Sequence, residues 1–483
     1  MTIGRKVVSA IGWSAGIKIG FQLLTWAMTL LVIRILSPDD YGLMAISQVV
    51  MGFVGCLSNL GLGDALIQRD DTPRPVVASV FGVLILLSLS LTMTTAIAAY
   101  PIADWYDEPR LIPLIQVASI GFLLSGLTTL PRVYLLKNMQ MRPMFILELS
   151  SGLMGALSTV GLAYTGFGVW SLMLGGLIGH LVRVVGMALL ASEYFVKPSF
   201  NIRLVRPLMS FGIYRTLEYT LWVVFVSADV LIIGWQLTPA DLGFYAVALN
   251  FAAMPLNKIA PIINQTAFPA FALIQNQPAE ARFYVLKAMR LMCLVTVPVF
   301  FGISAVAPEV VDLVFGPQWL PSEPLLAVLA LAMSFRAILL VIPSYLQGIG
   351  NAKASFWCNL SSAVLLTPLF IIGCYWGTLG VSYAWLLGYP FVFVINALIA
   401  SRYGKLSFWH ILSMPVRPMA AGAAMMVAVA ALRPYLHGGE VQTVILLVLA
   451  GAAVYSGIIL LAFRPLLWEF VSLVYKRQHH PNT

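Results

Sequence analysis

Apolar runs of about twenty residues recur from one end of this sequence to the other. A helix rises about 1.5 Å per residue, so each run is long enough to cross a hydrocarbon layer of roughly 30 Å. Hydrophobic residues make up 60% of the 483 residues and charged residues only 10%, whereas soluble domains carry roughly 25% charged residues. A soluble core could not bury this much apolar surface. The sequence therefore predicts an all-α, polytopic membrane protein.

Apolar runs bounded by charged, proline and glycine residues predict about fourteen membrane-spanning helices. The expected spans are 9–33, 42–63, 76–100, 113–135, 144–164, 168–191, 209–234, 242–264, 284–306, 323–346, 355–375, 378–400, 415–435 and 442–463. The first run is longer than the apolar part of a typical secretory signal and no small-residue cleavage site follows it. We therefore expect it to be retained as the first span.

Lysine and arginine residues collect on one side of the predicted membrane. With a cytoplasmic N-terminus, the inner segments hold 21 of the 28 cations and the outer segments hold Arg34, Arg110 and Arg433. The positive-inside rule therefore predicts that both termini are cytoplasmic. This sidedness explains the net charge of +9 better than a nucleic-acid surface, which needs cations clustered on a water-facing patch.

One block of the sequence returns about two hundred residues later. LSPDDYG at 36–42 is followed by LTPADLG at 237–243, each after an apolar segment. Six predicted helices separate the two starts, so both halves have the same orientation, as in transporters built from parallel repeats. The sequence thus predicts three parts: an N-terminal lobe of helices one to six (1–200), a C-terminal lobe of helices seven to twelve (201–408), and an additional pair of helices with a cytoplasmic tail (409–483).

Four cations fall inside predicted spans, namely Lys18, Arg215, Lys258 and Arg336. A charge in hydrocarbon costs about 2.5 to 3.5 kcal/mol on insertion scales, so it normally faces a bundle interior or a watery cavity. The helical rise places all four near the midplane or in its inner half. We expect them to converge on the space between the lobes and to bind substrate. The alternative is that they snorkel or form isolated ion pairs.

Polar neighbours accompany two of these cations. Gln22 lies one turn from Lys18, and Asn257 directly precedes Lys258 and lies seven residues, two turns, after Asn250. Prolines interrupt the helix that carries Asn257, and the backbone groups they free fit a cavity-lining helix better than a lipid-facing one. Gln22 and Asn257 are therefore further candidate substrate-binding residues. The alternative for each asparagine is a role in joining helices.

Two acidic residues of the seventh predicted span, Glu218 and Asp229, are candidates for coupling to an ion. Glu218 lies three residues after Arg215, so a local pair that neutralises both is the alternative. Asp229 lies about eight residues from the outer end of its span and is either an outer-gate carboxylate or an interfacial residue. The sequence contains no G-x-x-x-x-G-K-[ST] phosphate loop. We therefore expect an ion gradient, or consumption of the product outside, to supply the energy.

Patterns typical of catalysis or metal binding are missing from the sequence. The four cysteines lie in apolar spans without paired metal spacing, so we expect small buried hydrophobes. The five histidines are scattered, and the longest polar loops are under about twenty residues. A membrane glycosyltransferase, polymerase or ligase would need a larger outer domain. We expect no enzyme, no cofactor and no metal.

Several stretches resemble a known family: GWSAGIKIGFQLLTWAMTLLVIRILSPDDYGLMAIS, NLGLGDALIQRDD, AFPAFALIQ, AVAPEVVDLVFGPQWLP and LQGIGNA. They are similar to the polysaccharide-transporter branch, the lipid-linked oligosaccharide flippases, of the multidrug/oligosaccharidyl-lipid/polysaccharide flippase superfamily, and most to its colanic-acid-exporter-like subgroup. The resemblance covers nearly the whole chain. It implies two six-helix lobes plus two further helices. It also implies movement of undecaprenyl-diphosphate-linked oligosaccharide across the bacterial inner membrane for O-antigen, exopolysaccharide or capsule biosynthesis.

The resemblance and the intramembrane cations agree, because a diphosphate in a low-dielectric cavity needs compensating Lys or Arg. We therefore expect a flippase that works by alternating access, a monomer among membrane lipids, with a polysaccharide polymerase and co-polymerase as possible partners and no nucleic acid. Two alternatives remain. A drug/cation antiporter of the same superfamily would need an acidic cavity, and a membrane-embedded enzyme of glycan assembly would change its substrate covalently.

Overall fold

The computed structural model describes residues 20–22, 24–58, 62–63, 66, 73–138, 140–192, 196–206, 220, 223, 226–436 and 439–462, with the backbone alone at 141, 261–262, 264–266 and 268–269. Every regular element in these ranges is helical. Eleven of the helices are long and apolar enough to cross a membrane. The all-α membrane architecture is therefore confirmed.

The eleven spans match eleven of the fourteen predicted ones. Of the other three, 9–33 overlaps a shorter apolar helix, Gly20–Ile35. The predicted span 242–264 lies inside a longer helix, α10 (Pro239–Leu273). The predicted span 209–234 falls largely outside the described residues. The count of fourteen therefore stays a prediction.

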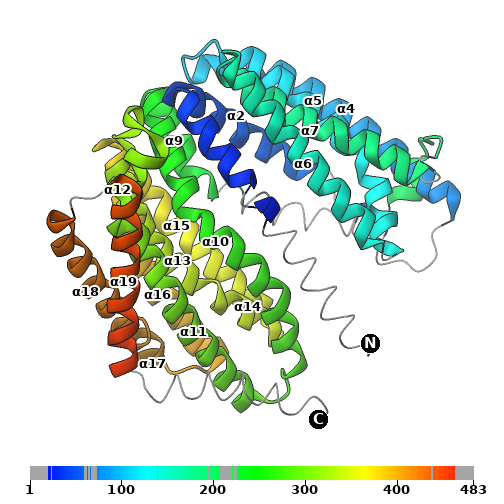
Figure 1. Cartoon of the computed structure of the whole chain (residues 1–483). Coiled ribbons are helices and arrows are strands. Elements are labelled where there is room, and N and C mark those ends of the chain that lie inside the picture. Colours follow the sequence, from blue (N-terminus) through cyan, green and yellow to red (C-terminus); the bar gives the residue numbers. More distant parts are fainter. Residues whose placement is uncertain are drawn as a thin grey trace, which may run out of the picture. The chain divides into compact units, whose positions relative to one another are not determined.

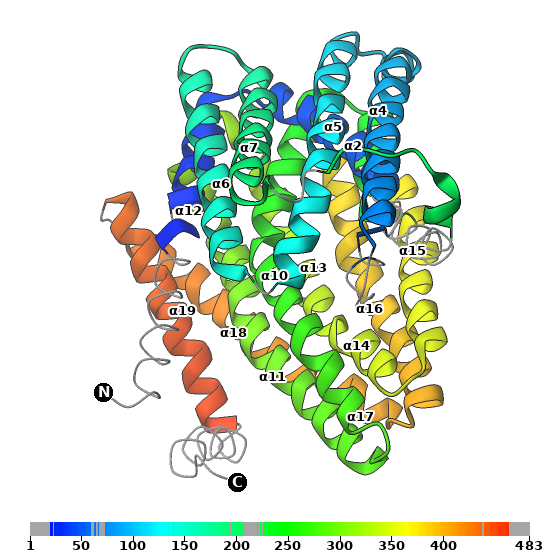
Figure 2. The ribbon, with the colours of Figure 1, turned by 90° about the vertical axis from the view of Figure 1, so that its right-hand side faces the viewer.

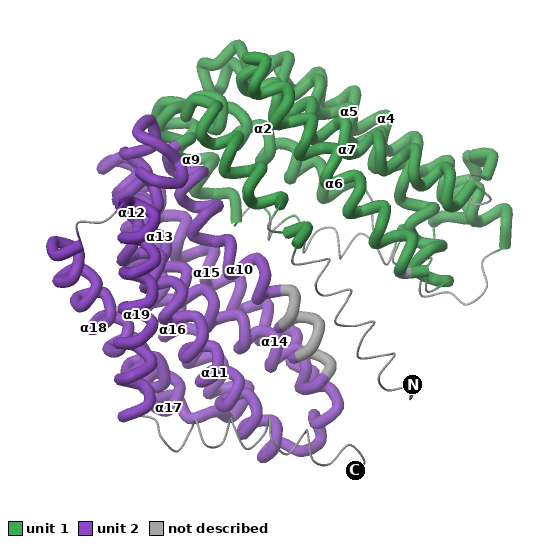
Figure 3. The backbone as a smooth tube through the Cα atoms, viewed as in Figure 1, with its two compact units in different colours: residues 1–243 green, residues 244–483 purple. Residues whose placement is uncertain are grey.

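The chain divides into two compact units, 1–243 and 244–483 (Figure 3). The first unit contains α2 (Pro38–Leu57), α4 (Arg74–Trp105), α5 (Leu111–Lys137), α6 (Met141–Tyr164), α7 (Val169–Leu190), α9 (Ala228–Gln236) and the first turn of α10 (Figure 1). The second unit contains the rest of α10, α11 (Pro278–Ala305), α12 (Ala307–Val310), η2 (Val311–Phe315), η3 (Pro317–Trp319), α13 (Ser322–Leu339), α14 (Val341–Gly348), α15 (Ala352–Cys374), α16 (Gly377–Gly404), α17 (Phe408–Ser413), α18 (Val416–Leu432), η4 (Arg433–Tyr435) and α19 (Glu440–Ala462).

Neighbouring helices in the first unit pair through short turns, α4 with α5 and α6 with α7 (Figure 1). Small residues let α6 and α7 approach closely: a Cβ added to Gly155 would lie 3.1 Å from the carbonyl oxygen of Gly175 and 3.4 Å from the Cα of Gly179. Such small-residue contacts are typical of helix packing in membranes, where lipid tails supply no hydrophobic drive toward association.

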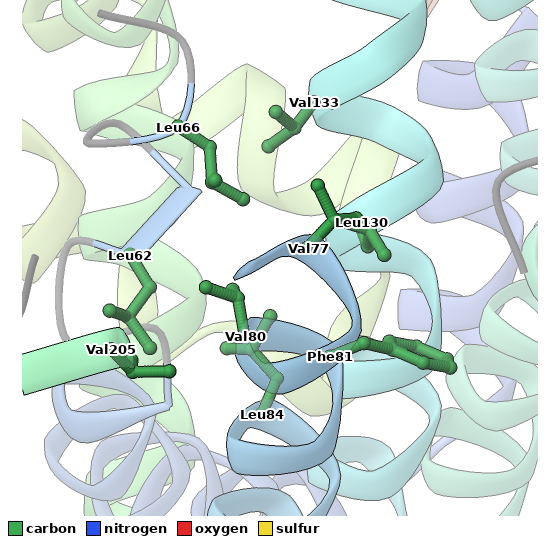
Figure 4. Close-up of a cluster of buried hydrophobic side chains, with 9 residues drawn as sticks. All are labelled: Leu62, Leu66, Val77, Val80, Phe81, Leu84, Leu130, Val133 and Val205. Carbon is green, nitrogen blue, oxygen red and sulfur yellow. The ribbon is translucent and has the colours of Figure 1, made fainter. Parts of the chain in front are cut away.

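An apolar cluster fills the space around the first turns of α4 (Figure 4). Its members are Leu62, Leu66, Val77, Val80, Phe81, Leu84, Leu130, Val133 and Val205. Val205 belongs to the segment after α7, and that segment returns to α4, where the Ser199 amide donates to the Ala78 carbonyl at 2.9 Å. A Cβ at Gly82 would clash with the Ser199 carbonyl oxygen. The cluster therefore fixes the 196–206 segment against α4.

The repeated heptapeptides begin two helices in the same way. Ser37 caps α2 by accepting from the Asp40 amide at 3.3 Å, while its own hydroxyl donates to the Asp40 carboxylate at 2.7 Å. Thr238 caps α10 with Asp241 through the same contacts at 3.2 and 2.6 Å. These reciprocal capping boxes satisfy amides that have no partner inside a helix. The second heptapeptide therefore starts a helix in the same way as the first.

The two repeated blocks also touch each other within the first unit. A Cβ added to Gly42 would clash with the backbone carbonyl of Pro239, and one added to Gly243 would clash with the carbonyl of Pro38. Each glycine thus contacts the residue that starts the other helix. This reciprocity is the local pseudo-twofold relation that two copies of one structural unit produce, and it requires glycine at both positions.

In the second unit α15 and α16 form another close pair, with a Cβ on Gly373 placed only 2.6 Å from the Gly380 carbonyl oxygen (Figure 2). The predicted span 323–346 is a broken helix, because α13 ends at Leu339 and α14 starts at Val341. Pro343 explains the break, since it has no N–H to donate to the Leu339 carbonyl.

The last two long helices of the described part, α18 and α19, pack on α11. Val297 of α11 shares an apolar cluster with Met425 and Tyr455, and the Tyr455 hydroxyl donates to the Leu294 carbonyl at 3.2 Å. At the other end of α11 the Arg433 guanidinium donates to the Ala305 carbonyl at 2.7 Å and to the Glu309 carboxylate at 3.2 Å. These helices are therefore firmly joined to the second unit.

Candidate functional site

Arg336 lies near the middle of the most thoroughly buried of the candidate spans, Ser322–Gly348, in which 72% of the most apolar window is buried. The helix α13 that carries it packs against α11 and α16. Most of its side chains are apolar, and Arg336 itself is half-buried. Removing a guanidinium from water is costly unless a partner compensates the charge. What surrounds Arg336 therefore decides what it can do.

The face of an indole ring lies beside the Arg336 guanidinium. Its Cζ is 5.6 Å from the ring centroid of Trp385, within the range in which an aromatic face attracts a cation. Trp385 is fully buried and comes from α16, which contacts α13. The structure thus joins a predicted binding residue to an aromatic residue that the sequence did not single out.

Three further aromatic residues hold Trp385. Its Nε1 donates to the Tyr245 hydroxyl of α10 at 2.7 Å. Tyr389 stacks on it with centroids 5.2 Å apart, and Phe370 of α15 lies 4.7 Å away in a tilted arrangement. All three are buried. An aromatic pair with its polar atom hydrogen-bonded has a defined ring orientation, so α10, α15 and α16 together fix the surface beside Arg336.

Within the part of the chain that the structure describes, Arg336 has no carboxylate partner. The ion pairs among the described residues join Arg110 to Glu108 and Arg433 to Glu309. A carboxylate would neutralise the guanidinium and occupy its N–H donors, whereas an aromatic face stabilises the charge and leaves those donors available. Arg336 is therefore suited to bind an anion.

Lys258 and Asn257 lie on the exposed side of α10. Tyr245, Ala252 and Leu256 form its buried face, while Asn257 and Lys258, with Asn250 two turns earlier, are exposed. A polar face on a helix at membrane depth avoids lipid and lines a cavity or another polar surface. The cavity-lining role of Asn257 and Lys258 stays a prediction.

The other predicted site residues stand as follows. Lys18, Arg215 and Glu218 lie outside the described residues. Gln22 is half-buried, and Thr25 and Thr29 on the same helix donate to carbonyls one turn back. Their hydroxyls are thus satisfied within the helix, which is a common arrangement for threonine in apolar spans.

Asp229 is fully buried. It sits in the first turn of α9, and its Oδ1 accepts from the Val230 amide at 2.8 Å. A buried carboxylate requires compensation by hydrogen bonds or charge. Both roles expected of Asp229, an outer-gate carboxylate and an interfacial residue, stay predictions.

The four cysteines are buried and free, as predicted. Among the described residues no group of three His, Cys, Asp or Glu side chains is arranged to hold a metal ion.

The aromatic setting of Arg336 was not predicted from the sequence. Aromatic residues in apolar spans resemble ordinary core, so Trp385 and Tyr245 carried no separate signal. One weak signal was present: the run Tyr383 to Pro390 reads YAWLLGYP, with aromatic residues near one another on a single helix.

Comparison with known proteins gives a family profile match over residues 31–324, described as polysaccharide biosynthesis protein. The succinoglycan biosynthesis transport protein ExoT of Rhizobium meliloti (strain 1021) is 27% identical over 491 residues, covering 99% of this chain and 97% of that protein. The lipopolysaccharide biosynthesis protein WzxC of Escherichia coli (strain K12) is 27% identical over 409 residues, covering 83% of this chain and 81% of that protein.

Solved structures place the fold among known transporters. A lipid II flippase MurJ, in an inward closed conformation, matches with a TM-score of 0.73 over 93% of this chain and 100% of that chain, at 14% identity. An inward-facing MATE multidrug transporter matches with a TM-score of 0.59 over 84% of this chain and 95% of that chain, at 16% identity. At these identities the likeness concerns the fold alone.

Proposed function

Because this chain belongs to the polysaccharide biosynthesis protein family, as its match over residues 31–324 establishes, we propose that it is a flippase for undecaprenyl-diphosphate-linked oligosaccharide. It moves this lipid from the cytoplasmic to the outer leaflet of the bacterial inner membrane for surface polysaccharide biosynthesis. Relatives that match over most of the chain are named as transport proteins for succinoglycan and as lipopolysaccharide biosynthesis proteins. This supports a transporter rather than an enzyme.

The observation that carries the proposal is Arg336, a half-buried arginine in mid-span that no described carboxylate neutralises. A diphosphate entering a low-dielectric cavity needs charge-assisted hydrogen bonds, and guanidinium supplies them in a bidentate geometry. A cationic drug would be repelled from such a site, which disfavours the antiporter alternative.

The remaining parts of the proposal follow from the predicted arrangement. Lys18, Arg215 and Lys258, with Gln22 and Asn257, join Arg336 in binding the diphosphate and the sugars. Glu218 and Asp229 are the candidates for coupling to a proton or sodium gradient. The lobes 1–200 and 201–408 alternate in access around this site, and 409–483 forms an additional part. Both termini are cytoplasmic, and a polymerase with its co-polymerase takes up the product outside.

The proposal is tested by complementing a deletion strain with single substitutions of Arg336. Arg336→Ala removes hydrogen bonds to a charged group, each worth about 1.5 to 3 kcal/mol, so we expect roughly ten- to hundredfold less surface polysaccharide at equal protein level. Arg336→Lys keeps the charge and should retain part of the activity.

Arg402→Ala is the matched control, because Arg402 also lies over an aromatic ring, that of Tyr403 at 5.9 Å, but is exposed at the end of α16. It should leave the polysaccharide within about twofold of wild type, as expected for a surface substitution. Full function of Arg336→Ala at normal protein level would remove Arg336 from the substrate site.

A further inference from the structure

The Trp385 ring is held in place by contacts that do not involve Arg336. Trp385 has no exposed surface; its Nε1 donates to Tyr245, and two other rings pack against it. A ring fixed by a hydrogen bond from its polar atom and by packing on its faces has little freedom to rotate. The position of the indole is therefore set before any substrate binds.

The Arg336 side chain, in contrast, is long and flexible. It loses considerable rotamer freedom when it is held in one place. Within the described part of the chain, the Arg336 guanidinium interacts with Trp385 alone, through this cation–π contact. The indole ring therefore orients Arg336. It leaves free the N–H donors of the guanidinium that a phosphate needs.

We propose that Trp385 and Tyr245 are positioning residues that preorganise Arg336 for the diphosphate of the transported lipid. Trp385 holds the guanidinium, and Tyr245 holds Trp385 by accepting its Nε1–H. This inference rests on the proposed function, because it assumes that Arg336 binds the lipid diphosphate. The network formed by these residues spans α10, α13 and α16. We expect it to strengthen substrate binding and not to drive the movement of the helices.

Preorganisation has a definite kinetic signature. A residue that only holds a binding group in place changes the substrate concentration for half-maximal transport more than the maximal rate. The attraction between an aromatic face and a cation corresponds to a change of about two- to thirtyfold in the dissociation constant. We expect Trp385→Leu to weaken binding of undecaprenyl diphosphate by about tenfold, and Tyr245→Phe, which removes only the acceptor, by about two- to fivefold.

The experiment measures binding of undecaprenyl diphosphate to the full-length protein in lipid nanodiscs. The variants are Trp385→Leu, Trp385→Phe, Tyr245→Phe and Arg336→Ala, with the doubles Trp385→Leu/Arg336→Ala and Trp385→Phe/Tyr245→Phe. Tyr403→Leu, which removes the ring beside the exposed Arg402, is the matched control and should bind like wild type. Melting temperatures check that each variant is folded, and the Phe variants serve if Trp385→Leu does not fold.

The double variants separate positioning from packing. If Trp385 acts through Arg336, Trp385→Leu has no further effect on binding once Arg336 is alanine, and the two Phe substitutions together cost no more than the larger of them alone. Additive losses in both cycles would mean a structural role and overturn the inference. Unchanged binding in Trp385→Leu and Tyr245→Phe would also overturn it.

The same data distinguish this inference from the proposed function. If wild type does not bind undecaprenyl diphosphate, the proposed function fails and the inference falls with it. If wild type binds and Arg336→Ala weakens binding while the aromatic variants do not, the function stands and the positioning role alone is rejected. If Arg336→Ala binds like wild type, the site assignment is wrong and the inference is rejected with it.

Discussion

Asp40 holds the starts of two helices at once. Its Oδ2 accepts from the Ser37 hydroxyl and amide at the start of α2, and its Oδ1 accepts from the Val169 amide at the start of α7 at 2.8 Å. Asp241 in the second heptapeptide has the capping contacts with Thr238, but within the described residues its carboxylate accepts no hydrogen bond from a second helix. The two aspartates can therefore be compared directly: Asp241 caps one helix, whereas Asp40 caps one helix and also binds the start of a second.

We expect Asp40→Ala to lower the melting temperature in detergent more than Asp241→Ala does. Each substitution removes the carboxylate half of a capping box, and Asp40→Ala also removes a charge-assisted hydrogen bond to the Val169 amide worth about 1.5 to 3 kcal/mol. Thermal unfolding followed by fluorescence measures the difference. Equal losses in the two variants would show that the link between α2 and α7 contributes nothing to stability.

At the scale of elements, two glycines allow the starts of α2 and α10 to cross. Alanine at Gly42 or Gly243 would place a methyl group against the backbone of the opposite proline, and backbone cannot move aside as the end of a side chain can. Overpacking of this kind costs about 1 to 3 kcal/mol. Because the two contacts are reciprocal, we expect Gly42→Ala and Gly243→Ala to lower the folding stability by similar amounts.

Gly42→Ala and Gly243→Ala should therefore each lower the melting temperature, while Gly161→Ala and Gly176→Ala should not. Gly161 and Gly176 lie within helices, and nothing lies within 4 Å of a Cβ built on them, so alanine there is neutral or stabilising by up to about 1 kcal/mol. The measurement is thermal unfolding of all four purified variants. A loss at the control positions equal to that at Gly42 would mean that the crossing of α2 and α10 is not the cause of the loss at Gly42.

The membrane-spanning helices were predicted well wherever a long apolar run is enough to identify them. The length of the apolar runs located eleven spans. The structure adds that the serine, threonine and aspartate of the heptapeptides cap helices, in contacts between residues three apart in sequence. The break between α13 and α14 was missed, although Pro343 lies inside the predicted span, because proline is tolerated in many membrane helices. The helical turns η2 and η3 before α13, where Phe315 and Trp319 are fully buried, have no periodic pattern that would predict them.

The candidate site was predicted only in part, for a physical reason. A charge such as Arg336 in an apolar span is visible in sequence because its desolvation must be compensated. The sequence does not indicate its partner, because Trp385 lies on a helix distant in sequence and resembles an ordinary core residue. Only the fold brings α10, α13 and α16 together. Asp229 was identified by its charge, but its full burial depends on packing around α9 that the sequence pattern does not contain.

At the scale of the whole molecule, this is a multi-pass membrane protein of the polysaccharide biosynthesis family, and no carboxylate among the described residues neutralises its mid-span Arg336. Both features support our proposal that it transports an anionic lipid. The alternating movement of the lobes belongs to that proposal. An enzyme of glycan assembly would leave a covalent mark on the lipid, whereas a flippase changes only the leaflet in which the lipid resides. The two functions are therefore separable by one measurement.

That measurement uses purified protein in liposomes containing lipid-linked oligosaccharide, with a membrane-impermeant sugar-oxidising or sugar-binding reagent reporting the leaflet and mass spectrometry reporting the lipid. We predict that wild type moves the lipid between leaflets without covalent change and that Arg336→Ala moves it at least about tenfold more slowly. Absence of leaflet movement under an imposed proton or sodium gradient, or a covalently altered lipid, would contradict the account.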